Sequence, residues 1–335
     1  MRRVAALALA AALATAGCGV GKGAADLGTA SKGGRAKICV MPKLVGIPYF
    51  NATERGARDA ARELDVELDF SGPTEAAAVQ QVQYIQQWVQ LQCDAISVAA
   101  NDPDSLAPAL QEAEQAGVKI SAWDSDVAKD ARSVFINQAT FAAVGNALAD
   151  IMASETDKKG KFLVVTGSLT APNTNAWIEA IEKRFKDRYP KMSVASIQPG
   201  EEDLQKGIDT AKSYLTANPD TAGVFGVTSV ALPGVAEAVR QLGLTGKVKV
   251  TGNTDPILAK PYIDAGVIKR AVLWNPEDLG YLAVHVAKRQ VDGTLPKSGS
   301  FEAGRLGKVK LTKRDEVLLG PPLVYSAKDV DRYKF

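Results

Sequence analysis

Histidine and cysteine are scarce in this chain, which has one histidine, His285, and three cysteines in 335 residues. Structural zinc sites take closely spaced Cys and His ligands, so this inventory argues against a metal centre. A Ser-His-Asp triad would have to use His285, which lies in a helical pattern at 281–288, and we therefore expect no catalytic triad. Cys39 and Cys93 are compatible with either a disulfide or two free core thiols.

The chain also has little net charge. Its formal charge is +2, and loss of Arg2 and Arg3 with an N-terminal leader would leave it neutral, so we expect no nucleic-acid partner. Beyond the leader no apolar stretch is long enough to cross a bilayer. The segment 243–247 lacks the spacing of a phosphate-binding P-loop, and no G-x-G-x-x-G follows the first predicted strand, so we expect no cofactor.

The N-terminus has the features of an export signal. Two arginines precede a run of apolar and small residues at 4–16, and the segment 15–18 resembles a bacterial lipobox. We predict a lipoprotein signal peptide at 1–17 and lipidation of Cys18. The lipid would anchor the exported protein to the outer face of the cytoplasmic membrane, or the protein would lie in the periplasm. The alternative is plain secretory cleavage with Cys18 free. Residues 18–36, rich in Gly, Ala, Ser and Lys, are typical of a flexible tether.

From residue 37 onwards, short β-branched runs alternate with longer amphipathic segments, which is typical of parallel sheets covered by helices. The first half predicts strands at 37–41, 66–70, 95–99 and 118–122 and helices at 52–64, 75–92 and 104–116. The second half predicts helices at 141–153, 175–187, 203–217, 231–242 and 256–265 and strands at 161–165, 192–197, 223–227, 247–251 and 268–274. Two successive doubly wound units are the simplest interpretation.

Polar and aromatic residues gather directly after these predicted strands. Ligands of open parallel sheets bind beyond the carboxyl ends of the strands. Carboxylates and amides suit neighbouring hydroxyl groups, and aromatic rings pack against the C–H face of a pyranose, so the pattern favours a small polyhydroxylated ligand. The positions concerned are 43, 48–50, 101–102, 123–126, 137–138, 167–170, 228–229, 253–255 and 274–275.

Two other interpretations of these polar residues stay open. Lys43 is compatible with a salt bridge between lobes, to Asp124 or Asp126, as well as with ligand contact. Asp124 and Asp126 are also compatible with the carboxylate pair of a glycosidase, although no other feature of the sequence suggests hydrolysis.

Several segments carry a family pattern, in order, at 42–50, 71–74, 122–126, 135–138, 167–170, 175–177, 231–233 and 272–275. Together they resemble the type I periplasmic binding proteins of ABC sugar importers, in the branch with rhamnose-binding and autoinducer-2-binding receptors. The resemblance implies an α/β fold of two Rossmann-like, doubly wound lobes joined by a three-segment hinge, with the ligand clamped between them. By this likeness lobe 1 comprises 37–138 and 276–296, and lobe 2 comprises 139–275 and 297–335.

The resemblance also bears on the pocket. Lys43 and Asp124 match ligand-contacting positions of the family. Autoinducer-2 receptors carry an Asp-Gln pair where this chain has Asn173 and Thr174, and a Pro-x-Ala segment where it has 227–229. These departures favour a monosaccharide such as rhamnose, with autoinducer-2 as the alternative ligand. The expected ligand-binding residues are Lys43, Phe50, Asp102, Trp123, Asp124, Asp126, Gln138, Asn173, Asn175, Thr228, Asn253 and Trp274.

A receptor of this kind implies an ABC-transporter permease as its partner, a monomeric state, and hinge closure on the sugar without chemistry. The effector-binding half of a transcription regulator shares this fold but would need an N-terminal helix-turn-helix, where this chain has a leader and a tether. A signal receptor that docks onto a sensor kinase or chemoreceptor is a further alternative, which the sequence does not separate from import.

Overall fold

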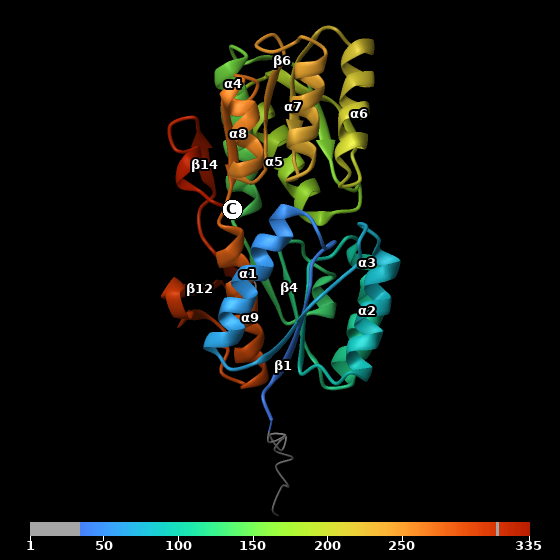
Figure 1. The fold of residues 1–335 in the computed structure, drawn as a ribbon, viewed down its shortest axis with the longest axis vertical. Helices are drawn as coiled ribbons and strands as arrows, with labels where there is room; N and C mark the ends of the chain where they lie inside the picture. Colours follow the sequence, from blue (N-terminus) through green and yellow to red (C-terminus); the bar gives the residue numbers. More distant parts are fainter. Residues whose placement is uncertain (1–33, 313–314) are drawn as a thin grey trace, which may run out of the picture. The chain divides into compact units, whose positions relative to one another are not determined.

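The computed structural model describes residues 34–312 and 315–335, in which helices and strands alternate and form two main sheets (Figure 1). The predicted signal peptide at 1–17, Cys18 and nearly all of the tether at 18–36 lie outside the described residues. None of the helices in this described part combines the length and apolar character that a membrane span needs.

The first sheet has eight strands. They are β1 (Lys37–Met41), β2 (Glu67–Phe70), β3 (Ala95–Val98), β4 (Lys119–Trp123), β5 (Val134–Asn137), β11 (Gly299–Glu302), β12 (Lys308–Thr312) and β13 (Glu316–Leu318). Their order is β11-β12-β13-β5-β4-β3-β1-β2, parallel from β13 to β2 and antiparallel from β11 to β13. The strands β3 and β5 are wholly buried, as expected of a parallel sheet covered on both faces.

Four helices cover this sheet, namely α1 (Pro48–Glu63), α2 (Ala78–Gln90), α3 (Pro103–Gln115) and α9 (Pro276–Val291). Helices α1 and α9 lie side by side on one face, and α2 and α3 on the other (Figure 1). Gly56 and Gly280 allow the close approach of α1 and α9, because a Cβ atom on either would overlap the backbone carbonyl of Glu277 or Thr53.

The second sheet has the parallel order β7-β6-β8-β9, and single bridges continue it from β9 to β10, which pairs with β14. Its strands are β6 (Lys159–Thr166), β7 (Lys191–Pro199), β8 (Thr221–Gly226), β9 (Lys249–Gly252), β10 (Arg270–Leu273) and β14 (Leu323–Ser326). Its helices are α4 (Phe141–Glu155), α5 (Pro172–Arg188), α6 (Leu204–Ala217), α7 (Ala231–Gln241) and α8 (Pro256–Asp264).

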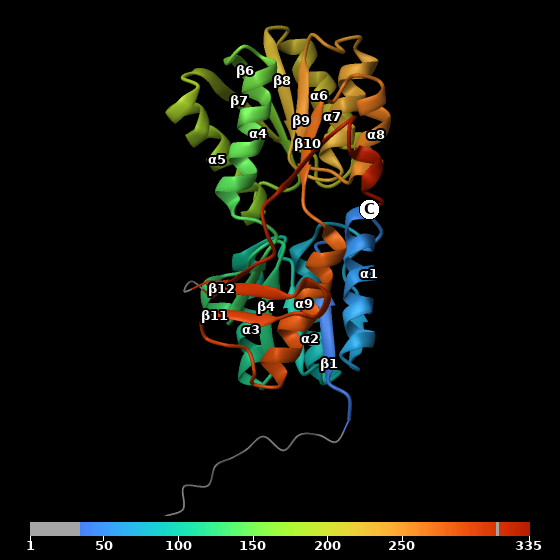
Figure 2. The ribbon, with the colours of Figure 1, turned by 90° about the vertical axis from the view of Figure 1, so that its left-hand side faces the viewer.

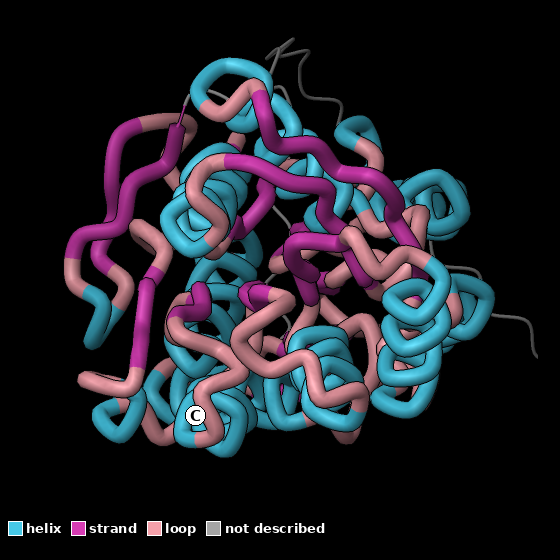
Figure 3. Tube along the Cα trace, turned by 90° about the horizontal axis from the view of Figure 1, so that it is seen from above, coloured by secondary structure: helices cyan, strands magenta, loops and turns pink. Residues whose placement is uncertain are grey.

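Helices α4 and α5 pack on one face of the second sheet, and α6 and α7 pack on the other (Figure 2). In the view from above, helices surround the strands (Figure 3). Three short 3-10 helices complete the secondary structure of the described residues, at Lys129–Ala131, Gly304–Leu306 and Val330–Arg332. The predicted α/β class, with two doubly wound units, is confirmed.

The chain passes between the two sheets at 138–140, 274–275 and 319–322. The first two crossings match the prediction, but the third was expected near Pro296. Strand β13 pairs in parallel with β5, so the strands between 299 and 318 belong to the first sheet, and only β14 joins the second. The assignment of all of 297–335 to the second lobe is therefore wrong.

Cys39 and Cys93 form a disulfide, with their Cα atoms 6.1 Å apart. Cys39 lies in β1, and Cys93 comes two residues before the neighbouring strand β3. Both residues are buried. Of the two states that the sequence left open, the structure has the disulfide.

Candidate functional site

A pocket is lined by residues that follow strands of both sheets. From the first sheet come residues after β1 and β4, and from the second come residues after β7, β8, β9 and β10 and from the first turns of α5. The lining residues are Lys43, Ile47, Tyr49, Phe50, Asp124, Asn173, Thr174, Trp177, Glu202, Val227, Thr228, Ser229, Asn253, Leu273 and Trp274. The pocket therefore lies at the carboxyl ends of the strands, where parallel sheets bind their ligands.

A chain of hydrogen bonds crosses this pocket. Lys43 Nζ donates to Asn173 Oδ1 at 2.9 Å, and Asn173 Nδ2 donates to Asp124 Oδ2 at 3.3 Å. The Tyr49 hydroxyl donates to Asp124 Oδ1 at 2.7 Å, and Trp274 Nε1 donates to that hydroxyl at 2.9 Å. Lys43, Tyr49 and Asp124 follow strands of the first sheet, whereas Asn173 and Trp274 belong to elements of the second, so the chain joins the two sheets.

Burial shifts the pKa values of the ionisable groups in this hydrogen-bonded chain. It lowers the pKa of Lys43, against the opposing effects of Asp124 and Glu202. Burial also raises the pKa of the Asp124 carboxyl, and the Lys43 charge and the Tyr49 hydroxyl oppose this rise. Asp124 also has a left-handed backbone with φ +60°, a conformation that is uncommon outside glycine and gathers at functional sites. The site thus holds two buried ionisable groups, Lys43 and Asp124, which are joined through the Asn173 amide.

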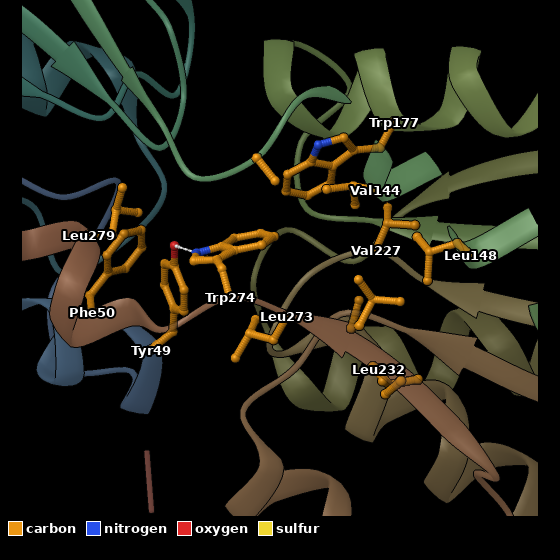
Figure 4. Packing of buried hydrophobic residues seen from close by; sticks show 14 of the residues in the cluster. Tyr49, Phe50, Val144, Leu148, Trp177, Val227, Leu232, Leu273, Trp274 and Leu279 are labelled. Carbon is orange, nitrogen blue, oxygen red and sulfur yellow. Dashed lines mark hydrogen bonds between the residues drawn. The ribbon is translucent and has the colours of Figure 1, made fainter. Parts of the chain in front are cut away.

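Aromatic rings form the apolar part of the pocket (Figure 4). The Trp274 ring lies between Tyr49 and Trp177, with ring centroids 6.1 and 5.5 Å apart. Phe50 packs edge-on against Tyr49 at 5.0 Å. Such rings exclude water from hydroxyl-directed hydrogen bonds and offer faces for the C–H groups of a sugar.

Asn253, directly after β9, has both side-chain amide atoms buried without a hydrogen-bond partner among the described residues. The indole nitrogen of Trp177 is in the same state. Buried polar groups are nearly always paired, and both residues line the pocket. Their free donors and acceptors therefore suit a polar ligand.

Seven of the twelve predicted ligand-binding residues line this pocket. They are Lys43, Phe50, Asp124, Asn173, Thr228, Asn253 and Trp274. Lys43 was compatible with a contact between lobes or with ligand contact. It lines the pocket and also contacts an element of the second sheet through Asn173, so both interpretations apply in part.

The other five predicted residues are placed elsewhere. Asp102 caps α3 by accepting from the Ser105 N–H, Asp126 forms an ion pair with Arg132 at 2.6 Å, and Asn175 donates to the Leu169 carbonyl. Trp123 is a core residue beneath Phe50, and Gln138 lies buried at the first crossing. Local capping, pairing or packing engages all but Gln138, whose amide atoms lack partners among the described residues. Asp126 therefore does not join Asp124 as a carboxylate pair in the pocket.

Eight of the fifteen lining residues are not among the twelve predicted ligand-binding residues, and Tyr49, Trp177 and Glu202 are three of these eight. Tyr49 lies within the polar and aromatic segment 48–50, beside the predicted Phe50. Trp177 is one helical turn after Asn173, and helical spacing from a predicted site residue could have found it. Glu202 follows the predicted strand at 192–197, so the rule that polar residues after a strand reach the sheet edge would have found it.

The chain matches the model of the periplasmic binding protein domain over residues 38–295. It belongs to the periplasmic binding protein family. The position of the pocket, beyond the strand ends of both sheets, and the three crossings agree with the type I fold that the sequence resemblance implied.

Individual relatives of this family member differ in their ligands. The D-allose-binding periplasmic protein of Escherichia coli (strain K12) is 24% identical over 253 residues, which cover 73% of this chain and 81% of that protein. A solute-binding protein of an ABC transporter from Clostridium phytofermentas, with bound L-rhamnose, is 28% identical, with a TM-score of 0.85 and coverage of 89% and 98%. LsrB from Clostridium saccharobutylicum, in complex with AI-2, is 25% identical, with a TM-score of 0.86 and coverage of 90% and 100%.

Proposed function

We propose that this periplasmic binding protein is the sugar receptor of an ABC importer, binding a monosaccharide between its two lobes without chemistry. The observation that carries the proposal is the hydrogen-bonded chain from Lys43 through Asn173 to Asp124, which crosses the pocket between elements of the two sheets. A sugar hydroxyl accepts from an ammonium group and donates to a carboxylate at the same time. One ring could therefore replace the Asn173 bridge with bonds of its own to both lobes.

Closure follows from this arrangement. A ligand that contacts both lobes binds the closed form more tightly than the open one, and that difference in affinity shifts the population. The closed form would then be read by the membrane permease, which is the proposed partner of this monomeric receptor.

The ligand is proposed to be a monosaccharide, with a 6-deoxyhexose such as rhamnose as the leading candidate. Rhamnose-bound and AI-2-bound proteins resemble this chain almost equally, with TM-scores of 0.85 and 0.86, so the fold does not choose between them. The pocket residues Asn173, Thr174 and Ser229 support the sugar, because they replace the Asp, Gln and Ala that the autoinducer-2 branch presents. A site that leaves a buried polar group unpaired rejects a ligand strongly.

Calorimetric titration of L-rhamnose, D-allose, D-ribose and autoinducer-2 against one preparation tests this proposal. We expect at least one monosaccharide to bind about tenfold better than autoinducer-2, a difference of roughly 1.4 kcal/mol. Tighter binding of autoinducer-2 would favour the alternative receptor function. The absence of heat with every compound, and of any rise in melting temperature, would contradict the receptor proposal itself.

Membrane attachment through Cys18 is the second part of the proposal, and it is supported by the apolar run and lipobox-like segment of the leader. Cys18→Ser should move the protein from the membrane to the soluble fraction, because both acyl chains are lost with the thiol. Fractionation of cells that express the two forms measures this. Continued sedimentation of the variant with membranes would argue against lipidation.

A further inference from the structure

The connection between β7 and α6 holds two consecutive glutamates, Glu201 and Glu202, each with φ +53°. A left-handed backbone at two adjacent non-glycine residues is costly and persists where the surrounding structure holds it. Glu201 is exposed and forms an ion pair with Lys206. Glu202, one residue later, lines the pocket instead.

Gly167, after β6, makes room for this carboxylate, because a Cβ atom there would overlap Glu202 Oε1. The Thr228 hydroxyl accepts from the Ala231 N–H at 3.0 Å, and its interaction with the Glu202 side chain lowers the pKa of that carboxyl. Gly167 and Thr228 are thus neighbours of the Glu202 carboxyl at the edge of the pocket.

The remaining oxygen, Glu202 Oε2, is buried and has no hydrogen-bond partner in residues 34–312 and 315–335. Burial raises the pKa of this carboxyl, and Lys43 opposes the shift while Asp124 adds to it. By contrast, both oxygens of Asp124 accept hydrogen bonds, from Tyr49 and Asn173. Glu202 is therefore the pocket carboxylate with an acceptor to spare, and it follows a strand of the second sheet, whereas Asp124 follows a strand of the first.

We propose that Glu202 is a specificity-determining ligand residue, which accepts a hydrogen bond from a sugar hydroxyl on the side of the second sheet. The inference rests on the proposed function and deepens it. With Asp124 on the first sheet and Glu202 on the second, the ligand is a polyol with hydroxyl donors at two separate positions of its ring. A sugar that lacks the hydroxyl facing Glu202 leaves this buried acceptor unpaired and is rejected.

Titration of Glu202→Ala and Glu202→Gln with L-rhamnose, D-allose, D-ribose and D-arabinose tests the proposal, with Glu201→Gln as the matched control. We expect Glu202→Ala to weaken the best-bound sugar about 10- to 100-fold, the range for a hydrogen bond to a charged group. Glu202→Gln, which keeps one acceptor, should lose less, and Glu201→Gln should bind as the parent protein does. Unchanged affinity of Glu202→Ala would overturn the proposal.

Melting temperatures without ligand separate a binding role from a structural one. Glu202→Gln removes a carboxyl whose pKa is raised by burial and whose charged form is therefore costly. The melting temperature of this variant should equal or exceed that of the parent protein. A drop in both melting temperature and affinity for both Glu202 variants would overturn the proposal in favour of a structural role.

Deoxy analogues of the best-bound sugar locate the contact. The analogue that lacks the hydroxyl facing Glu202 should lose affinity for the parent protein and lose much less for Glu202→Ala, because one partner is already absent. Equal losses in both proteins for every analogue would contradict the contact. If the parent protein binds none of the sugars, the proposed function fails at the parent titration, before any Glu202 variant is compared.

Discussion

Asp124→Ala is expected to weaken sugar binding by about 2–5 kcal/mol, or roughly 30- to 4,000-fold, the cost of removing one partner of a buried, charged hydrogen bond. Asp124 is the acceptor at the end of the polar chain from Lys43, and the loss of its charge leaves Lys43 buried without a carboxylate at the end of that chain. The folded state should change little in stability, because two effects oppose each other. The variant removes a carboxyl whose ionised form burial makes costly, and it leaves the Tyr49 hydroxyl and the Asn173 amide without this acceptor.

Calorimetry with the best-bound monosaccharide measures this loss, and Asp126→Ala provides the control. Asp126 lies two residues further along, carries the same charge, and is paired with Arg132 outside the pocket. We expect Asp126→Ala to bind with unchanged affinity. Equal affinities of Asp124→Ala and the parent protein would remove Asp124 from the ligand site, and an unfolded Asp124 variant would indicate a structural role instead.

The second large effect concerns stability. Replacing Cys39 and Cys93 together with alanine should lower the free energy of unfolding by about 4 kcal/mol, because the disulfide closes a loop across a sequence separation of 54 residues. The cross-link restricts the unfolded chain, and it does so between β1 and the entry to β3, which are neighbouring strands of the first sheet. Urea denaturation monitored by circular dichroism measures the difference.

Two comparisons sharpen this experiment. The parent protein treated with a thiol reductant should lose about as much stability as the double variant, whereas the double variant should not respond to the reductant. Sugar affinity should stay the same, since neither cysteine lines the pocket. Equal denaturation midpoints of the parent protein with and without reductant would mean that the bond contributes no stability.

The sequence predicts the α/β core well because its elements have strong local patterns. The strand at 37–41 agrees residue for residue with β1, and the helix at 104–116 differs from α3 by one residue at each end. Buried parallel strands leave continuous apolar runs, and amphipathic helices leave helical spacing. Both signals are contained within about fifteen residues and need no knowledge of distant partners.

The C-terminal strands are different. Strand β13 has three residues, and it is defined by its pairing with β5, about 180 residues earlier, for example between Glu316 and Phe135. A three-residue strand has no usable periodicity of its own. Its sheet therefore could not be assigned from the local sequence, and the boundary near Pro296 was wrong.

The site was predictable to the extent that a position after a strand implies a place at the sheet edge. That rule finds Asp124 and Asn253, but it also selects Asp102, because a carboxylate after a strand can equally cap the next helix. Glu202 shows the opposite difficulty. The direction of the Glu202 side chain depends on the left-handed backbone at 201–202 and on the space beside Gly167. Gly167 follows a different strand, β6.

The interleaved path of the chain has a consequence for the order in which the protein can be completed during synthesis. Strand β13 lies between β12 and β5, so the first sheet lacks strands until the chain has been made as far as Leu318. Strand β10 lacks its partner β14 until the chain has reached Ser326. A nascent chain that ends before Gly299 exposes the unpaired edges of β5 and β10, which are sites for aggregation or for chaperone binding. Late completion also leaves the chain without its finished fold for most of translation, which is the state that passage through an export channel requires.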